Sequence, residues 1–220
     1  MQNRGTSNFS TLSTRRLQRS LWPTALVVSV FQLTGCASTP PPMTGFLGDY
    51  SKLVKDNDGA LRYIDPELRR YSGFIVAPVQ IRTQRTPPVL DREERAEVAR
   101  YMHDSLRKVL REVGFRLTET PGSEIGLIRV AITDVQKSKW YLNLHPVTKL
   151  TGAGLGGASM EGEVVDSVTG KQLAAVVQSG KGNQFELDTF SELDDVKDVI
   201  DDWAEAAGKR LKELRERPER

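Results

Sequence analysis

The chain of 220 residues contains one cysteine, Cys36, and its neighbours give that side chain the best-defined chemistry in the sequence. Cys36 comes directly after an apolar run, Leu21–Leu33, and small residues flank it at Gly35 and Ala37. A thiol is nucleophilic enough near neutral pH to take up a lipid as a stable thioether. A secreted chain that used disulfides would carry an even number of cysteines. The lone thiol therefore favours lipid attachment over a disulfide.

The segment in front of Cys36 has the order of an export signal. Residues 1–20 are polar and basic, and the apolar run that follows is interrupted by Pro23. That run is too short for a membrane-spanning helix, which needs about 20 apolar residues, but it suits the apolar part of a signal peptide. Together with Leu33, Thr34 and Gly35 before the cysteine, it resembles the lipobox of bacterial lipoproteins. We predict a lipoprotein signal peptide over residues 1–35.

The lipobox resemblance implies that the chain is cut before Cys36 and that its thiol carries a diacylglyceryl group, usually with a further acyl chain on the new amino group. Each buried methylene contributes about 0.8 kcal/mol, so two or three chains give a stable anchor. Ala37 is not the aspartate that commonly retains Gram-negative lipoproteins in the inner membrane. The resemblance implies outer-membrane attachment, with membrane lipid as the partner at Cys36 and the domain in the periplasm. A plain secretory signal and a twin-arginine signal at Arg15 and Arg16 remain alternatives.

Composition separates the leader from the rest of the chain. Residues 1–35 hold four of the 31 basic residues and none of the 29 acidic ones, so the remainder carries a net charge of −2. A domain without a basic excess lacks the charge that drives phosphate binding, and nucleic acid is not expected as a partner. Residues 36–44 combine the lipidated cysteine with three consecutive prolines. We expect them to form a semi-rigid spacer that reaches about 25 Å.

The remaining residues predict alternating strands and helices. A helix is expected over 91–113, with Asp91 and Glu94 as a capping box and Gly114 at its end. A second helix is expected from Ser191, its candidate cap, to about Arg215. Strands are expected over 73–82, 115–118 and 125–135, followed by a hairpin from 160 to 180 that turns at Thr169 and Gly170.

These elements predict an α+β fold. We expect one mixed sheet of about five strands in the order β-α-β-β-β-β-α, with two long helices on one face and a parallel crossover through the first helix. The domain is expected to cover residues 45–215, and residues 216–220 form a charged tail.

Several motifs could support catalysis or cofactor binding, but each is better explained as an ordinary structural feature. The glycines of 152–157 match a dinucleotide-binding spacing, but a strand rather than a helix is expected after them. His103 and His145 lack the further ligands that a zinc site needs. Acidic residues between 192 and 202 suit the N-terminal half of a helix. We predict no catalytic, metal-binding or cofactor-binding residues.

Four stretches resemble a known family: GFLGDYSKL at 45–53, RYIDP at 62–66, FIVAPV at 74–79 and the hairpin DSVTGK at 166–171. Together they are similar to a family of uncharacterised bacterial lipoproteins, the domain of unknown function 3313, over roughly residues 44–215. The resemblance implies an envelope lipoprotein without an assigned activity. It supplies no catalytic residues.

Two segments are candidates for contact with a partner. Phe46, Leu47 and Tyr50 are expected to seal one end of the domain, with Asp49 capping a short helix through Leu53, or else to form a docking surface. Trp140 and Tyr141 are expected to pack over the core, or else to form a contact patch, because aromatic residues are enriched at interfaces.

The function that follows is a non-enzymatic adaptor or accessory module of the cell envelope, with an unidentified envelope protein as a possible partner. Two alternatives stay open. One is a cell-envelope enzyme, such as a peptidoglycan-acting hydrolase, whose site is assembled from residues distant in sequence. The other is a module that binds a small molecule or glycan through the segment 139–157.

Overall fold

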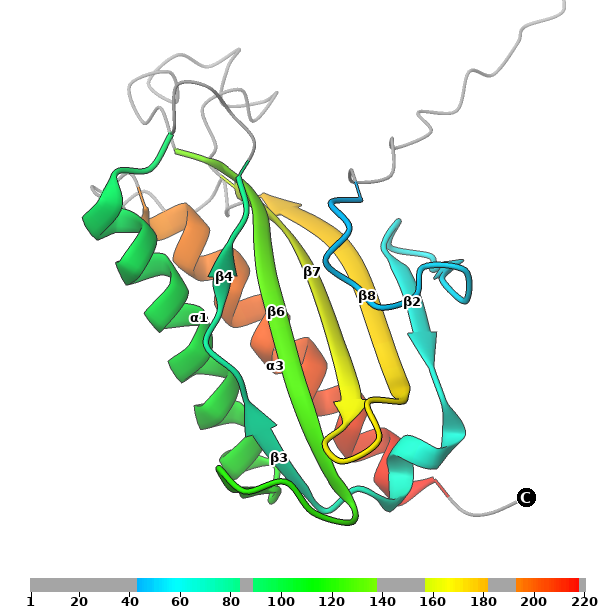
Figure 1. Ribbon diagram of the computed structural model, residues 1–220. Coiled ribbons are helices and arrows are strands. Elements are labelled where there is room, and N and C mark those ends of the chain that lie inside the picture. The colour runs from blue at the N-terminus through cyan, green and yellow to red at the C-terminus, as the bar shows by residue number, and fades with distance from the viewer. Residues whose placement is uncertain (1–42, 84–88, 138–156, 182–192, 218–220) are drawn as a thin grey trace, which may run out of the picture. The chain divides into compact units, whose positions relative to one another are not determined.

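Three long strands form the centre of one mixed sheet in the computed structural model, which describes residues 43–83, 89–137, 157–181 and 193–217. These strands are β6 (Ile125–Gln136), β7 (Gly157–Asp166) and β8 (Gln172–Lys181), and each pairs antiparallel with the next. All the described residues belong to one compact unit of the chain, Ser38–Arg220. The antiparallel centre confirms the predicted hairpin (Figure 1).

Short strands extend the sheet on both sides. Next to β6 lie β3 (Gly73–Val76) and β4 (Gln80–Ile81), both parallel to it, and β5 (Arg116–Leu117) pairs with β3. Next to β8 lie β2 (Leu61–Ile64) and then β1 (Val54–Lys55), both antiparallel to their neighbours. A 3-10 helix, η1 (Pro66–Arg70), connects β2 to β3.

Within the described residues the sheet thus has eight strands, and the prediction of about five is wrong. The predicted strand 73–82 divides into β3 and β4 around Pro78, which has no N–H group for a sheet hydrogen bond. β4 and β5 lie within the predicted strands 73–82 and 115–118, whereas β1 and β2 were not predicted, and β1 with two residues is too short to show an alternating pattern. The α+β class with a single sheet is confirmed.

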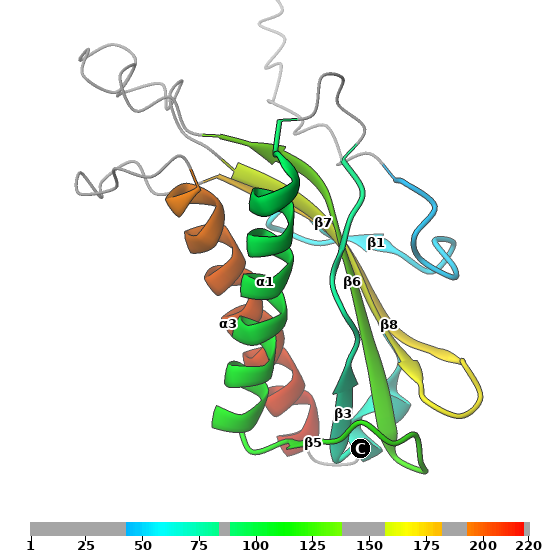
Figure 2. The same cartoon turned by 60° about the vertical axis from the view of Figure 1, so that its left-hand side comes forward.

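Two long helices lie side by side on one face of the sheet: α1 (Arg92–Glu112) and α3 (Asp194–Glu216) (Figures 1 and 2). Asp91 and Glu94 form the predicted capping box, and Gly114 ends α1 with a φ of +86°. α1 lies between β3 and β6 along the chain, and these two strands are parallel, so the predicted crossover is confirmed. The predicted cap of the second helix, Ser191, lies outside the described residues.

The main core fills the space between the helices and the sheet. Its largest fully buried side chains include Phe74, Met102 and Ile200, and Phe74 meets Phe115 edge to face with 5.1 Å between ring centroids. A second, smaller cluster lies on the other face of the sheet around Phe46, Leu47 and Val177. Both faces of the central strands are therefore covered, which explains why β7 is buried from Gly157 to Val165.

The two helices approach each other closely at Gly208. A methyl group placed on Gly208 would lie 2.2 Å from Cγ1 of Val109 on α1, closer than any real contact. Glycine costs a helix interior about 1 kcal/mol relative to alanine, so the close approach compensates for an unfavourable residue.

We therefore expect Gly208→Ala to lower the free energy of unfolding by about 1–3 kcal/mol, although the same change in an open helix would raise it. Removing the obstructing side chain with Val109→Ala should make Gly208→Ala neutral or stabilising. Urea denaturation of the two single variants and the double variant measures both effects. A stabilising Gly208→Ala in the unaltered background would contradict the close packing.

Candidate functional site

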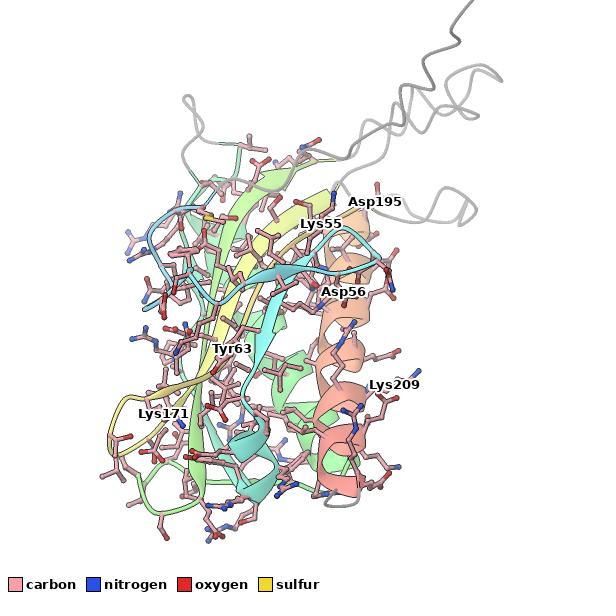
Figure 3. All side chains as sticks on the ribbon, turned by 90° about the vertical axis from the view of Figure 1, so that its right-hand side faces the viewer. Lys55, Asp56, Tyr63, Lys171, Asp195 and Lys209 are labelled. Carbon is pink, nitrogen blue, oxygen red and sulfur yellow. The ribbon has the colours of Figure 1, made fainter. Side chains whose placement is uncertain are left out.

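Residues 43–53, which we call the strap, cross the face of the sheet opposite the helices. Figure 3 looks along the sheet from the β2 side and shows the strap on one side and α3 on the other. Phe46 and Leu47 are buried there against Ala131 of β6 and Val177 of β8. The strap thus seals the outer face of the sheet with the same residues that the sequence indicated as a possible docking surface.

Two buried glutamates hold the strap in place. Glu161 and Glu163 alternate with Gly162 on β7, so both side chains point to the outer face. Glu161 is fully buried and accepts hydrogen bonds from the backbone N–H of Thr44, at 2.5 Å, and from the hydroxyl of Tyr50. Because a buried carboxylate without partners is very costly, Glu161 depends on the strap for its stability.

Glu163 has a cation among its partners. Its carboxylate accepts hydrogen bonds from the backbone N–H of Gly48 at 3.0 Å, from Nε2 of Gln172 at 2.9 Å and from Nε of Arg129 at 2.9 Å. The guanidinium of Arg129 also lies 5.7 Å from the ring centre of Phe46. One arginine therefore neutralises the glutamate and covers the main apolar side chain of the strap.

The other candidate contact residues occupy different environments. Asp49 is partly exposed and stabilises a turn by accepting hydrogen bonds from N and Oγ of Ser51 at 2.8 and 2.7 Å, which lower the pKa of Asp49. The prediction of a short helix through Leu53 is wrong, because residues 51–52 form a turn followed directly by β1. Cys36, Trp140 and Tyr141 lie outside the described residues.

A second polar cluster stabilises the turn that connects β7 to β8. Asp166 accepts hydrogen bonds from the backbone N–H groups of Val168 and Thr169 and from the hydroxyl of Tyr71, which lower the pKa of Asp166 to about 2. The positive φ that the turn needs is at Gly170, with φ +73°, and not at Thr169.

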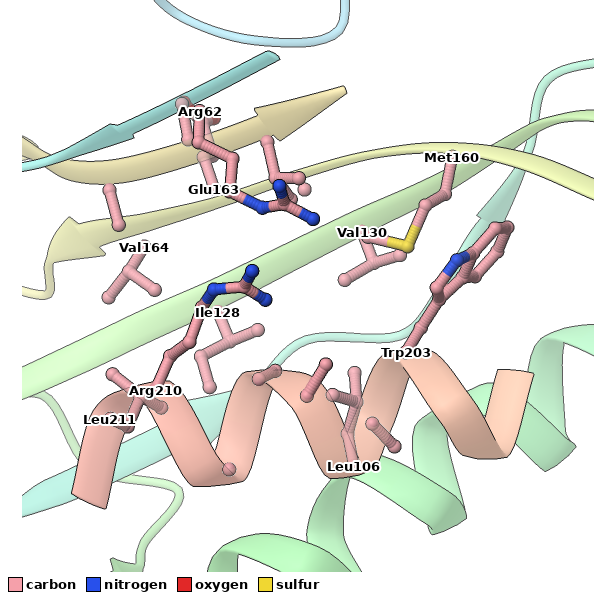
Figure 4. Close-up of a pocket in the computed structure, with 18 of the residues that line it drawn as sticks. Arg62, Leu106, Ile128, Val130, Met160, Glu163, Val164, Trp203, Arg210 and Leu211 are labelled. Atoms are coloured by element: carbon pink, nitrogen blue, oxygen red, sulfur yellow. The ribbon is translucent and has the colours of Figure 1, made fainter. Parts of the chain in front are cut away.

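An apolar cavity of about 130 Å³ lies between α3 and the sheet, which we call the α3 cavity (Figure 4). Its floor is formed by apolar side chains of β6, β7 and β8, and its walls by Leu106 of α1 and by Trp203 and Leu211 of α3. Two arginines, Arg62 of β2 and Arg210 of α3, stand at its mouth. The described residues that line the cavity include no serine, cysteine or histidine, so they offer no nucleophile–base pair.

The remaining chemical candidates form helix contacts instead of a site. Asp201, one of the acidic residues near the start of α3, accepts hydrogen bonds from Tyr101 and Ser105 of α1 at 2.6 and 2.7 Å. His103 contacts Asp104, its neighbour in sequence, at 3.2 Å. Among the residues that the structure describes, no three acidic, histidine or cysteine side chains gather as metal ligands would. His145 falls outside those residues.

The family of the chain follows from the sequence match over this whole domain. Residues 42–207 match the family described as "Protein of unknown function (DUF3313)", to which the chain belongs, as the resemblance predicted. A relative, the uncharacterized lipoprotein YdcL of Escherichia coli K12, is 28% identical over 208 residues, which covers 82% of this chain and 91% of YdcL. None of the helices in the described part of the chain is long and apolar enough to cross a membrane.

Solved structures with a similar arrangement include a PelC dodecamer from Paraburkholderia phytofirmans and a minor lipoprotein from Acinetobacter baumannii. PelC is 14% identical with a TM-score of 0.42, and the match covers 66% of this chain and 96% of PelC. The Acinetobacter lipoprotein is 15% identical with a TM-score of 0.35, over 66% of this chain and 93% of that one. These likenesses are too distant to transfer a function.

The sequence did not identify Glu161 and Glu163 as anchoring residues. Alternation of polar and apolar residues, as on β7, is also the pattern of an antiparallel strand with one face in solvent. Two features could have indicated that this face is covered. The two carboxylates share a strand face with the apolar Val165, and the apolar Phe46 and Leu47 need a surface against which to pack.

We predict that Glu161→Ala loosens the strap and leaves the sheet intact. Loss of the acceptor leaves the Thr44 N–H and the Tyr50 hydroxyl without their partner, so amide hydrogens of residues 44–53 should exchange at least about tenfold faster. Hydrogen exchange measured by mass spectrometry resolves this segment from β7 and β8. Asp49→Ala is the matched control, because its carboxylate bonds only within the strap.

Unchanged protection of residues 44–53 in Glu161→Ala would show that the strap is held by its apolar contacts alone. A general loss of protection throughout β6, β7 and β8 would also contradict the account, because it would assign Glu161 to the sheet and not to the strap.

We predict that Asp166 stabilises the hairpin in a pH-dependent way. Its pKa is lowered on folding, from 3.8 to about 2, so its contribution is complete above about pH 4 and is lost as the pH falls toward 2. Asp166→Asn should therefore lower the free energy of unfolding at pH 7 by about 1 kcal/mol. Denaturation at pH 7, 4 and 2 should show this difference shrinking with acidity. A difference that grows toward pH 2 would reverse the sign.

Proposed function

We propose that the protein is a non-enzymatic lipoprotein of the outer membrane, anchored through lipidated Cys36, whose periplasmic domain serves as an adaptor or accessory module for an envelope complex. The observation that carries this proposal is the position of the strap. Thr44 is bound to Glu161 of the central sheet only eight residues after Cys36. An extended spacer of that length reaches about 25 Å.

The short spacer limits the positions that the domain can take. A domain joined to its anchor by a long flexible linker samples many distances and directions from the membrane. Here the strap is part of the packed structure, because Phe46 and Leu47 are buried and Glu161 and Glu163 bind the strap backbone. The domain would thus be presented at a narrow distance from the bilayer, which suits a module that positions a partner.

Two further observations support the same proposal. The family relative YdcL is named a lipoprotein, which agrees with the lipobox at residues 33–37. The α3 cavity has an apolar lining, and the buried carboxylates Glu161 and Glu163 are engaged with the strap and with Arg129. Carboxylates that bind structural partners are not available to act on a substrate, which favours an accessory role over the alternative of a hydrolase.

We predict that Cys36→Ser abolishes processing and membrane attachment. Without the thiol there is no thioether and no cleavage before residue 36, so the chain should keep its leader and leave the outer-membrane fraction. Mass spectrometry of the purified chain and density-gradient fractionation of membranes measure the two effects. A Cys36→Ser chain that is cut normally and remains with the outer membrane would contradict the proposal.

Two substitutions at the next position test the choice of membrane. Ala37→Asp introduces the residue that commonly retains lipoproteins in the inner membrane, so the processed chain should shift to the inner-membrane fraction. Ala37→Ser, the matched control, should stay in the outer membrane. Equal distribution of both variants would contradict outer-membrane sorting.

The adaptor role is tested by photo-crosslinking in cells from Val168, which is exposed on the far hairpin. A discrete crosslinked partner should appear in the unaltered chain. It should disappear when a flexible 20-residue insert after Pro42 releases the domain from its fixed distance. A partner captured equally well with the insert would contradict a positioning role.

A further inference from the structure

The α3 cavity exists because small residues of α3 face the sheet. Near its start, α3 packs tightly on β8, where a methyl group on Gly180 would lie 2.6 Å from Cγ1 of Val199. Further along, Gly208 brings α3 close to α1. Between these two contacts, α3 presents Ala204 and Ala207 to the cavity, and alanine is too small to fill the gap. Close contacts of valine side chains with Gly180 and Gly208 thus flank the space at both ends.

Apart from Arg62, Gln178 and Arg210, the side chains that border the cavity on the helix side of the sheet are apolar. The floor consists of Ile128, Val130, Met160, Val164, Ala174 and Val176. Glu163 also borders the space, but its carboxylate is on the outer face with the strap. A purely apolar cavity of roughly 150 Å³ stays free of water and takes up apolar molecules of about six carbons. A volume of about 130 Å³ matches one aliphatic chain and is too small for two.

The mouth of the cavity places a loosely held cation beside this apolar space. Most hydrogen-bond donors of Arg62 already have partners, because its guanidinium donates to Asp58 at 2.6 and 2.7 Å, to Asp56 at 2.8 Å and to Gln178 at 2.9 Å. Arg210 faces it across the mouth (Figure 4), and its contacts with Asp56 and Asp58 are 3.7 and 3.9 Å, longer than hydrogen bonds. The two aspartates are thus neutralised mainly by Arg62.

We propose that the α3 cavity is a binding site for one medium-chain fatty acid, whose chain enters the cavity and whose carboxylate binds Arg210. The guanidinium of Arg210 can donate two parallel hydrogen bonds to a carboxylate. The apolar lining accepts the chain, and the mouth between β2 and α3 leaves the head group in water. The site is on the opposite face of the sheet from the strap, so it does not depend on the anchor.

The test uses the full chain in phospholipid vesicles, with Trp22 and Trp140 replaced by phenylalanine. Trp203 is then the only tryptophan, because the chain has three. Trp203 lines the cavity, so 8-bromooctanoate bound there should quench its fluorescence on contact. We expect saturable quenching that octanoate reverses. Vesicles of brominated phosphatidylcholine should not quench Trp203, which separates cavity binding from insertion into the bilayer.

Chain length and head group supply further readouts. Displacement by hexanoate, heptanoate and octanoate should strengthen about fourfold with each added methylene, as burial of one methylene predicts. Arg210→Gln should weaken binding of octanoate about tenfold and leave octanol unchanged, because it removes only the charged partner. Lys212→Gln is the matched control on the same helix and should change neither.

A filled cavity is the decisive variant. Ala207→Leu should abolish the reversible quenching, and Glu205→Leu, which adds the same side chain on the exposed side of α3, should not. Thermal melting shows whether both variants fold. If Ala207→Leu does not fold, Ala206→Leu, at the mouth of the cavity, takes its place. Absence of saturable quenching, equal binding by the filled variant, or an affinity independent of chain length would each overturn the proposal.

Discussion

The structure depends on two carboxylates that are buried in the middle of a sheet. Glu161 and Glu163 lie on the outer face of β7, where they would be solvated if nothing covered them. The strap covers them and excludes water, and it then has to supply the hydrogen bonds that water would have made. The carboxylates and the strap therefore require each other. The strap forms no strand of the sheet, so the glutamates provide its hydrogen-bond acceptors. The glutamates are shielded from water, so the strap provides their hydrogen-bond donors.

This mutual requirement connects the anchor to the core. The strap begins at the end of the spacer that follows Cys36, so in the proposed lipid-anchored form a pull on Cys36 would be transmitted to β7 at the centre of the sheet. A hydrogen-bonded, buried attachment resists such a pull better than an exposed loop. α1 and α3 cover the other face of the same strands, and the small alanine side chains of α3 do not fill the α3 cavity. One sheet thus separates an attachment face from a face with room for a ligand.

Local sequence signals predicted much of the fold. The capping box at Asp91 and Glu94, the end of α1 at Gly114 and the β7–β8 hairpin follow from interactions within a few residues of one another. β1 and β2 were not predicted, because β1 has only two residues and β2 pairs with β8, more than a hundred residues further along the chain, whereas β4 and β5 lie within the strands predicted at 73–82 and 115–118. The family was recognisable from GFLGDYSKL, since the same residues that define the strap carry the resemblance.

The candidate site was less accessible to sequence reasoning. Phe46 and Leu47 were singled out as residues that could seal one end of the domain, and the structure places them over the outer face of the sheet. Glu161 and Glu163, which bind the backbone of Thr44 and Gly48 in the same segment, are more than a hundred residues away. The α3 cavity depends on packing distances: the contact of Val199 with Gly180 sets how close α3 comes to β8, and the contact of Val109 with Gly208 sets how close α3 comes to α1. Such spacing is a property of packing and has no periodic signature in the sequence.

We propose that the strap fixes the domain at a short, defined distance from the bilayer, and energy transfer tests this distance most directly. Cys36 is the chain's only cysteine, so in the lipidated protein a cysteine introduced at exposed Met43 or Val168 is the sole free thiol for a donor dye. With acceptor dyes on the lipid head groups, we predict strong transfer from position 43 and much weaker transfer from position 168. Equal transfer from both positions, or stronger transfer from position 168, would contradict the account.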